Sequence, residues 1–131
     1  MESEVKYYRD KRGNFPAHEF INDPRNGRIK KQIEAAIAAL QINGLELMYT
    51  ERMSFIGVRD DGGPRIQGLY ELRNEKGKWR VAVYHDKAVD KFILLCGWRK
   101  NERRQPADIL KAQRMQEEYV TRKEQGDAVT D

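Results

Sequence analysis

Apolar runs and short polar turns alternate through the second half of the chain, in the pattern of an antiparallel meander. Three runs rich in β-branched and aromatic residues cover Gly68–Arg73, Lys78–His85 and Lys91–Trp98. The segments between them, Asn74–Gly77 and Asp86–Asp90, are polar and short enough for hairpin turns. Because strands joined by tight turns pair with their chain neighbours, we expect three consecutive antiparallel strands here.

Helical spacing is found before and after this region. Apolar residues recur at three- and four-residue intervals over residues 28–42, which are followed by a typical Asn-Gly helix end. Pro16 opens a short helix over residues 17–21, and we expect the two helices to form a hairpin that covers one face of the sheet. Pro106 opens a last helix over residues 107–123.

The order of these elements is that of an α+β domain. A further run at Glu4–Tyr8 predicts a first strand, and the stretch Arg59–Pro64 predicts a loop. We therefore expect one domain over residues 1–123, in which a helical hairpin and a C-terminal helix pack on a small antiparallel sheet. The polar residues 124–131 are expected to form a disordered tail.

Composition narrows the classes of function. The chain has 25 Lys and Arg against 21 Asp and Glu, and this net charge of +4 permits polyanion binding without demonstrating it. Cys96 is the sole cysteine of the sequence, which excludes an intrachain disulfide and a cysteine-ligated zinc site. The sequence has no metal-ligand motif and no Gly-x-x-x-x-Gly-Lys loop, so no cofactor is expected. Residues 1–10 lack the apolar core of a signal peptide, and no run has membrane-spanning length, so we expect a cytoplasmic protein without a membrane partner.

Basic side chains stand where the apolar strands begin or end. Arg73 ends the first strand of the meander and Arg80 lies near the start of the second. The third strand leads into a basic cluster made of Arg99, Lys100, Arg103 and Arg104. Guanidinium and ammonium groups bind phosphates and stabilise the negative charge that develops during strand cleavage. We expect a surface for a phosphate-rich ligand, and the alternative is a solvated face of arginines paired with carboxylates such as Glu71.

Two candidates for proton transfer lie on the second strand of the meander. Alternate residues of a strand share a face, so Tyr84 lies on the face of Arg80, whereas His85 shares the opposite face with Trp79. We expect that opposite face to be core, where a lone histidine is more often structural than catalytic. Tyr84 can stack on a base or hydrogen-bond a phosphate.

Four motifs, in this order, resemble the RelE/ParE superfamily of toxins and are most similar to its phage-derived, HigB-like subgroup. They are Gly68-Leu-Tyr-Glu-Leu-Arg73, Trp79-Arg-Val-Ala-Val-Tyr84, Leu94-Leu-Cys-Gly-Trp-Arg-Lys100 and Pro106-x-x-Ile109-x-x-Ala112. The match extends over residues 68–119 and is looser over residues 5–44. Asn101 stands where many relatives have a second lysine, and Glu102 adds a negative charge beside the basic cluster.

The resemblance implies a RelE-like fold and the toxin of a type II toxin–antitoxin pair. Toxins of this kind are metal-independent endoribonucleases, and they cleave mRNA on the translating ribosome by attack of the ribose 2′-hydroxyl on the adjacent phosphate. The implied partners are a helix-turn-helix antitoxin of the HigA type and, through the antitoxin complex alone, operator DNA.

The resemblance also implies roles for single residues. Arg80 and Lys100 would stabilise the developing charge. Tyr84 or His85 would transfer a proton or stack on a base. The phosphates would be positioned by the remaining basic residues, which are Arg73, Arg99, Arg103 and Arg104. Two other functions stay open: a degenerate, non-catalytic phage-derived protein that binds RNA or an antitoxin, and a ParE-like toxin directed at gyrase.

Overall fold

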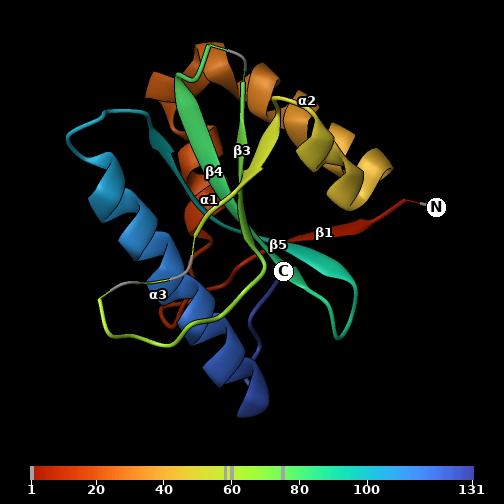
Figure 1. The fold of residues 1–131 in the computed structure, drawn as a ribbon, viewed down its shortest axis with the longest axis vertical. Coiled ribbons are helices and arrows are strands. Elements are labelled where there is room, and N and C mark those ends of the chain that lie inside the picture. The colour runs from red at the N-terminus through yellow and green to blue at the C-terminus, as the bar shows by residue number, and fades with distance from the viewer. Residues whose placement is uncertain (1, 58, 60, 75) are drawn as a thin grey trace.

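A computed structural model describes residues 2–57, 59, 61–74 and 76–131 (Figure 1). Over these residues one five-stranded sheet has the strand order β1-β5-β4-β3-β2. Its strands are β1 (Glu4–Tyr7), β2 (Met53–Phe55), β3 (Leu69–Arg73), β4 (Trp79–Asp86) and β5 (Lys91–Arg99). β3, β4 and β5 form the antiparallel meander that the sequence predicts. The sheet is mixed rather than purely antiparallel, because β1 pairs with β5 in parallel.

Helices cover both faces of the sheet (Figure 1). The predicted hairpin is confirmed: α1 (Pro16–Asn22) and α2 (Gly27–Asn43) pack on one face, where Trp79, Val81 and Val83 belong to the core. α3 (Gln105–Glu124) lies against the opposite face, where Ala112 and Tyr119 pack on the strands. Short 3-10 turns, η1 (Pro24–Asn26) and η2 (Gly44–Tyr49), precede and follow α2. The predicted α+β class is therefore confirmed.

The C-terminal segment differs from the expected disordered tail. Residues 125–131 return along β1, where Tyr8 forms an antiparallel bridge with Thr130 and the Arg9 N–H donates to the Val129 carbonyl at 2.8 Å. The buried Arg122 side chain donates to the Tyr8 hydroxyl at 3.0 Å and to the Arg9 carbonyl at 2.7 Å. The segment is ordered because backbone hydrogen bonds and one apolar side chain, Val129, attach it to the β1 end of the sheet.

Candidate nucleic-acid interface

The meander brings three of the predicted basic residues to one end of the sheet. Arg73 at the end of β3 is the register partner of Arg80 at the start of β4. Lys100 follows β5, and its backbone N–H donates to the Lys78 carbonyl at 3.0 Å. Arg73, Arg80 and Lys100 line one cavity of about 310 Å³ together with Glu51, Asn74, Lys76 and Gly77. We call Arg73, Gly77, Arg80 and Lys100 the cradle.

Gly77 lines the cradle with backbone alone, because it has no side chain. A Cβ atom at this position would lie 3.5 Å from Arg80 Nη2, 3.6 Å from Arg80 Nη1 and 3.7 Å from Lys100 Nζ. Gly77 has a φ of +65°, a conformation that L side chains rarely adopt. Two cationic groups therefore converge on a stretch of bare backbone, which is the arrangement that accepts an anionic oxygen.

Arg80 reaches the cradle from a buried position. Its side chain is only 5% exposed, and its Nη1 donates to the Trp79 carbonyl at 2.9 Å. Its Nε lies 3.3 Å from Glu71 Oε1, an ion pair without hydrogen-bond geometry. Ser54 Oγ donates to the same carboxylate oxygen at 3.1 Å. Because a buried charge is costly without a partner, Glu71 accounts for how Arg80 is held in the sheet.

Arg73 and Arg99 are held by hydrogen bonds to oxygen atoms of different segments of the chain. Arg73 Nε donates to the Glu51 carbonyl at 3.0 Å, so its guanidinium stays beside the cradle. Arg99 donates through Nε to Asn26 Oδ1 at 2.8 Å and through Nη2 to the Arg25 carbonyl at 2.6 Å. The structure therefore holds Arg99 against η1, outside the cradle.

A second cavity, of about 600 Å³, adjoins the cradle through Lys100. Its lining includes Arg25, Arg99 and Arg104. Arg103 is exposed in the loop before α3, where its backbone N–H donates to Asn101 Oδ1 at 3.0 Å. The basic cluster after β5 is thus spread between the two cavities and the outer surface of the loop.

The two predicted proton-transfer residues lie elsewhere. Tyr84 and His85 are four and five residues from Arg80 along an extended strand, or about 13 and 17 Å. Tyr84 packs edge-on against Tyr119 of α3 with ring centroids 5.6 Å apart, and burial raises the pKa of its hydroxyl. His85 stacks on Phe92 and places Nε2 3.0 Å from Asp90 Oδ1. Neither side chain belongs to the cradle.

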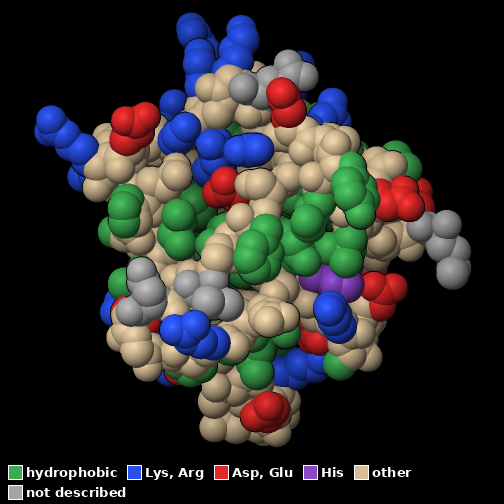
Figure 2. Space-filling model, viewed as in Figure 1, with side chains coloured by type: hydrophobic (Ala, Val, Ile, Leu, Met, Phe, Trp, Pro, Cys, Tyr) green, Lys and Arg blue, Asp and Glu red, His purple; other side chains and the backbone are tan. Residues whose placement is uncertain are grey.

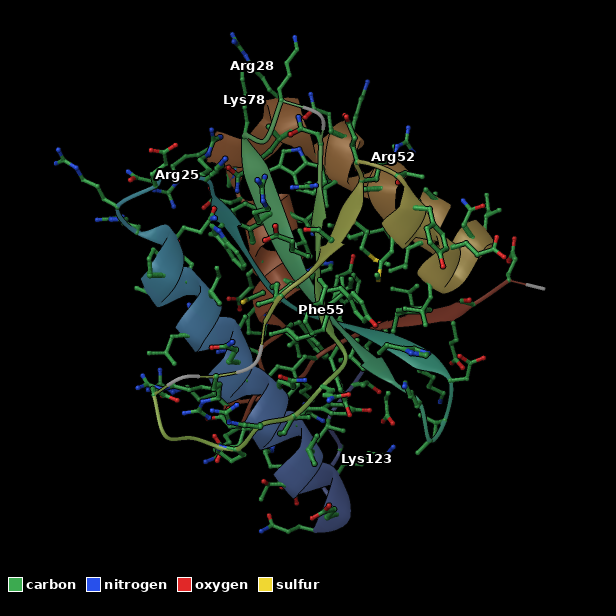
Figure 3. All side chains as sticks on the ribbon, in the orientation of Figure 1. Arg25, Arg28, Arg52, Phe55, Lys78 and Lys123 are labelled. Atoms are coloured by element: carbon green, nitrogen blue, oxygen red, sulfur yellow. The ribbon has the colours of Figure 1, made fainter. Side chains whose placement is uncertain are left out.

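The cradle is surrounded by further basic side chains, which the sequence patterns did not single out. Lys76 lines the cavity itself, and with Arg52 and Arg73 it also lines a neighbouring cavity of about 320 Å³ beside α2. Figure 3 places Arg25, Arg28, Arg52 and Lys78 around the same end of the sheet. Figure 2 shows Lys and Arg side chains gathered there, above an apolar patch. The structure thus extends the predicted strand-end cluster into a basic surface.

The described residues offer neither a metal-binding cluster nor a membrane-spanning helix. No group of three or more His, Cys, Asp or Glu side chains in this part of the chain is placed to hold a metal ion. None of the helices that the structure describes is both long enough and apolar enough to cross a membrane.

Comparison with known proteins adds little. No family model and no curated protein matches the chain. One chain from the crystal structure of the toxin–antitoxin complex RelBE2 of Mycobacterium tuberculosis is similar, with a TM-score of 0.43 and 13% sequence identity. The similarity covers 76% of this chain and all of that chain.

Proposed function

We propose that this protein is an RNA-cleaving toxin and that the cradle binds the phosphodiester to be cut. The observation that carries the proposal is the convergence of Arg80 Nη2 and Lys100 Nζ on the bare backbone of Gly77. Negative charge builds on the non-bridging oxygens of a phosphate during strand cleavage. Two cations close to the same oxygen, one of them held rigidly in the sheet, stabilise that charge more than they stabilise the ground state.

The chemistry proposed is attack of a ribose 2′-hydroxyl on the adjacent phosphorus. The P–O5′ bond breaks as the new P–O2′ bond forms, which leaves a 2′,3′-cyclic phosphate and a 5′-hydroxyl. Arg80 and Lys100 stabilise the pentacoordinate phosphate, and Arg73 positions the backbone of the RNA beside it. Tyr84 and His85 are too distant to exchange protons with the reacting oxygens directly. We therefore assign both proton transfers to solvent, which takes the proton of the 2′-hydroxyl and gives one to the leaving O5′.

The biological setting is proposed from the sequence motifs. We assign the protein to the HigB-like subgroup, acting in the cytoplasm on mRNA bound to the translating ribosome. Arg99, Arg103 and Arg104 would contact neighbouring phosphates, because they continue the basic surface beyond Lys100. A helix-turn-helix antitoxin of the HigA type would neutralise the toxin and bring the complex to operator DNA.

One observation favours a second function, a non-catalytic RNA-binding protein. Of the four side chains predicted to be catalytic, Tyr84 and His85 lie outside the cradle. A cradle that neutralises phosphates without moving protons would bind RNA and leave it intact.

The test is induced expression of the wild-type chain beside Lys100→Ala and Arg80→Ala, with growth followed and mRNA 5′ ends mapped. Lys100 is exposed, so its truncation leaves the fold intact, whereas Arg80→Ala strands the buried Glu71 carboxylate. Arg12→Ala, an exposed arginine of the β1–α1 turn, is the matched control.

We expect growth arrest with new 5′ ends for the wild type and the control, and loss of both for the two cradle variants. Arrest without new ends would instead indicate a protein target such as gyrase. A wild-type chain that is folded and causes no arrest would indicate the non-catalytic protein.

A further inference from the structure

Three side chains on three neighbouring strands connect the free edge of the sheet to the cradle. Ser54 on β2 donates to Glu71 on β3, and Glu71 pairs with Arg80 on β4. The Glu71 side chain is 11% exposed and that of Arg80 5%. Ser54 and Glu71 are direct register partners, so the strand pairing itself sets where the carboxylate lies.

The contacts of Arg80 hold its guanidinium from within the sheet, and both of its terminal nitrogens lie close to Gly77. Glu71 lies against Nε, and Nη1 is bound by the Trp79 carbonyl. Nη2 and Nη1 lie 3.5 and 3.6 Å from the Cβ position of Gly77, and Lys100 Nζ lies 3.7 Å from the same position. A guanidinium is a planar fork, so the ion pair at Nε and the hydrogen bond at Nη1 together set the direction of its other N–H groups.

We infer that Glu71 is a positioning residue that orients Arg80 toward the scissile phosphate, and that Ser54 orients Glu71. The inference rests on the proposed function, because it assigns Arg80 a phosphate to contact. Glu71 itself touches no substrate in this scheme and acts through Arg80. The gain it provides is preorganisation, since the N–H groups of Arg80 need no rearrangement when charge develops on the phosphate.

A carboxylate beside a phosphate-binding site also has an unfavourable electrostatic effect on RNA binding. Its negative charge repels RNA, so a Glu71 that merely neutralised the local charge would weaken binding and leave turnover unchanged. A positioning residue raises kcat despite that repulsion. Removing the charge at Glu71 therefore separates the two roles, since KM and kcat respond independently.

The experiment measures kcat and KM for mRNA cleavage on ribosomes by wild type, Glu71→Gln, Ser54→Ala and Glu102→Gln. Glu102→Gln is the charge-matched control, because Glu102 is an exposed carboxylate two residues from Lys100. We expect Glu71→Gln to lower kcat at least tenfold with KM unchanged or lower. Ser54→Ala should lower kcat two- to fivefold, and Glu102→Gln should lower KM alone. Equal kcat values for Glu71→Gln and Glu102→Gln would overturn the inference.

A second measurement separates this inference from the proposed function. The NMR signal of the Arg80 Nε–H group, assigned by its absence in Arg80→Lys, reports how firmly the guanidinium is held. We expect this proton to exchange with water at least tenfold faster in Glu71→Gln and unchanged in Glu102→Gln. A wild type that cleaves no RNA would refute the function alone, whereas unchanged exchange in Glu71→Gln would refute the positioning.

Discussion

Gly77→Ala tests whether a ligand occupies the space between Arg80 and Lys100. The new methyl group would lie 3.5 Å from Arg80 Nη2 and 3.7 Å from Lys100 Nζ, so the protein itself accommodates it in ordinary contact. An anionic oxygen bonded to both nitrogens at about 2.8 Å would compete with this methyl group for the space beside Gly77. The substitution therefore acts on the bound ligand more than on the free protein.

Two magnitudes follow from this geometry. The φ of +65° is unfavourable for alanine by about 1 kcal/mol, which lowers the Tm of a domain of this size by about 4 °C. Losing one charge-assisted hydrogen bond to the phosphate costs about 2 kcal/mol, or about a 30-fold loss of RNA affinity. A Tm lowered by about 4 °C leaves the protein folded at 25 °C. The loss of stability therefore does not account for the expected loss of RNA affinity.

The assay is fluorescence anisotropy of a labelled single-stranded RNA at low salt, with thermal unfolding of the same samples. Gly126→Ala is the matched control, because Gly126 has a φ of +83° and no atom within 4 Å of its Cβ position. We expect equal losses of Tm in both variants and a loss of affinity in Gly77→Ala alone. Wild-type affinity in Gly77→Ala would refute the assignment of this space to a phosphate oxygen.

Two further predictions concern β5. A Cβ atom at Gly97 would overlap the ring of Phe20, so Gly97→Ala should lower the free energy of unfolding by about 1–3 kcal/mol in urea denaturation, and an unchanged midpoint would contradict this packing. Burial raises the pKa of the Cys96 thiol to about 12, so a thiol reagent at pH 8 should label Cys96 only as fast as the protein unfolds. Rapid labelling in native buffer would show that β5 opens locally.

The part of the site that lies on the meander could be predicted from the sequence. The turn Asn74–Gly77 joins two clear strands, and tight turns fix which residues face each other across a hairpin. The pairing of Arg73 with Arg80 follows from that register. Strand alternation also placed His85 on the face of Trp79, away from the cradle, and the contacts of His85 agree with that placement.

The rest of the site depends on contacts between distant parts of the chain. Arg99 follows the aromatic Trp98 as in the sequence motif, but Asn26, 73 residues earlier, accepts its Nε–H group. β2 has only three residues in a stretch without clear periodicity, so the link from Ser54 to Glu71 has no local signal. The ordered tail likewise depends on contacts of residues 129–131 with residues 7–9, at the other end of the chain. Local patterns do not determine such pairings.

The position of α3 determines which part of this face of the sheet the helix covers. Arg80, Ala82 and Tyr84 share one face of β4, and α3 crosses that face (Figure 1). Ala82 is fully buried in the α3-side core, and Tyr84 packs on Tyr119. The helix begins at Gln105, and its first residues border a groove of about 600 Å³ that also has Glu71 in its lining.

At that end the strands carry the buried ion pair of Glu71 and Arg80, and the groove lies between Glu71 and the first residues of α3. An apolar pair in place of the ion pair would provide no group that binds a phosphate. The two charges balance each other within the sheet, and the terminal nitrogens of Arg80 still lie close to Gly77. A buried ion pair adds little net stability, so its presence at the uncovered end is better explained by the orientation it gives to Arg80 than by the stability of the fold.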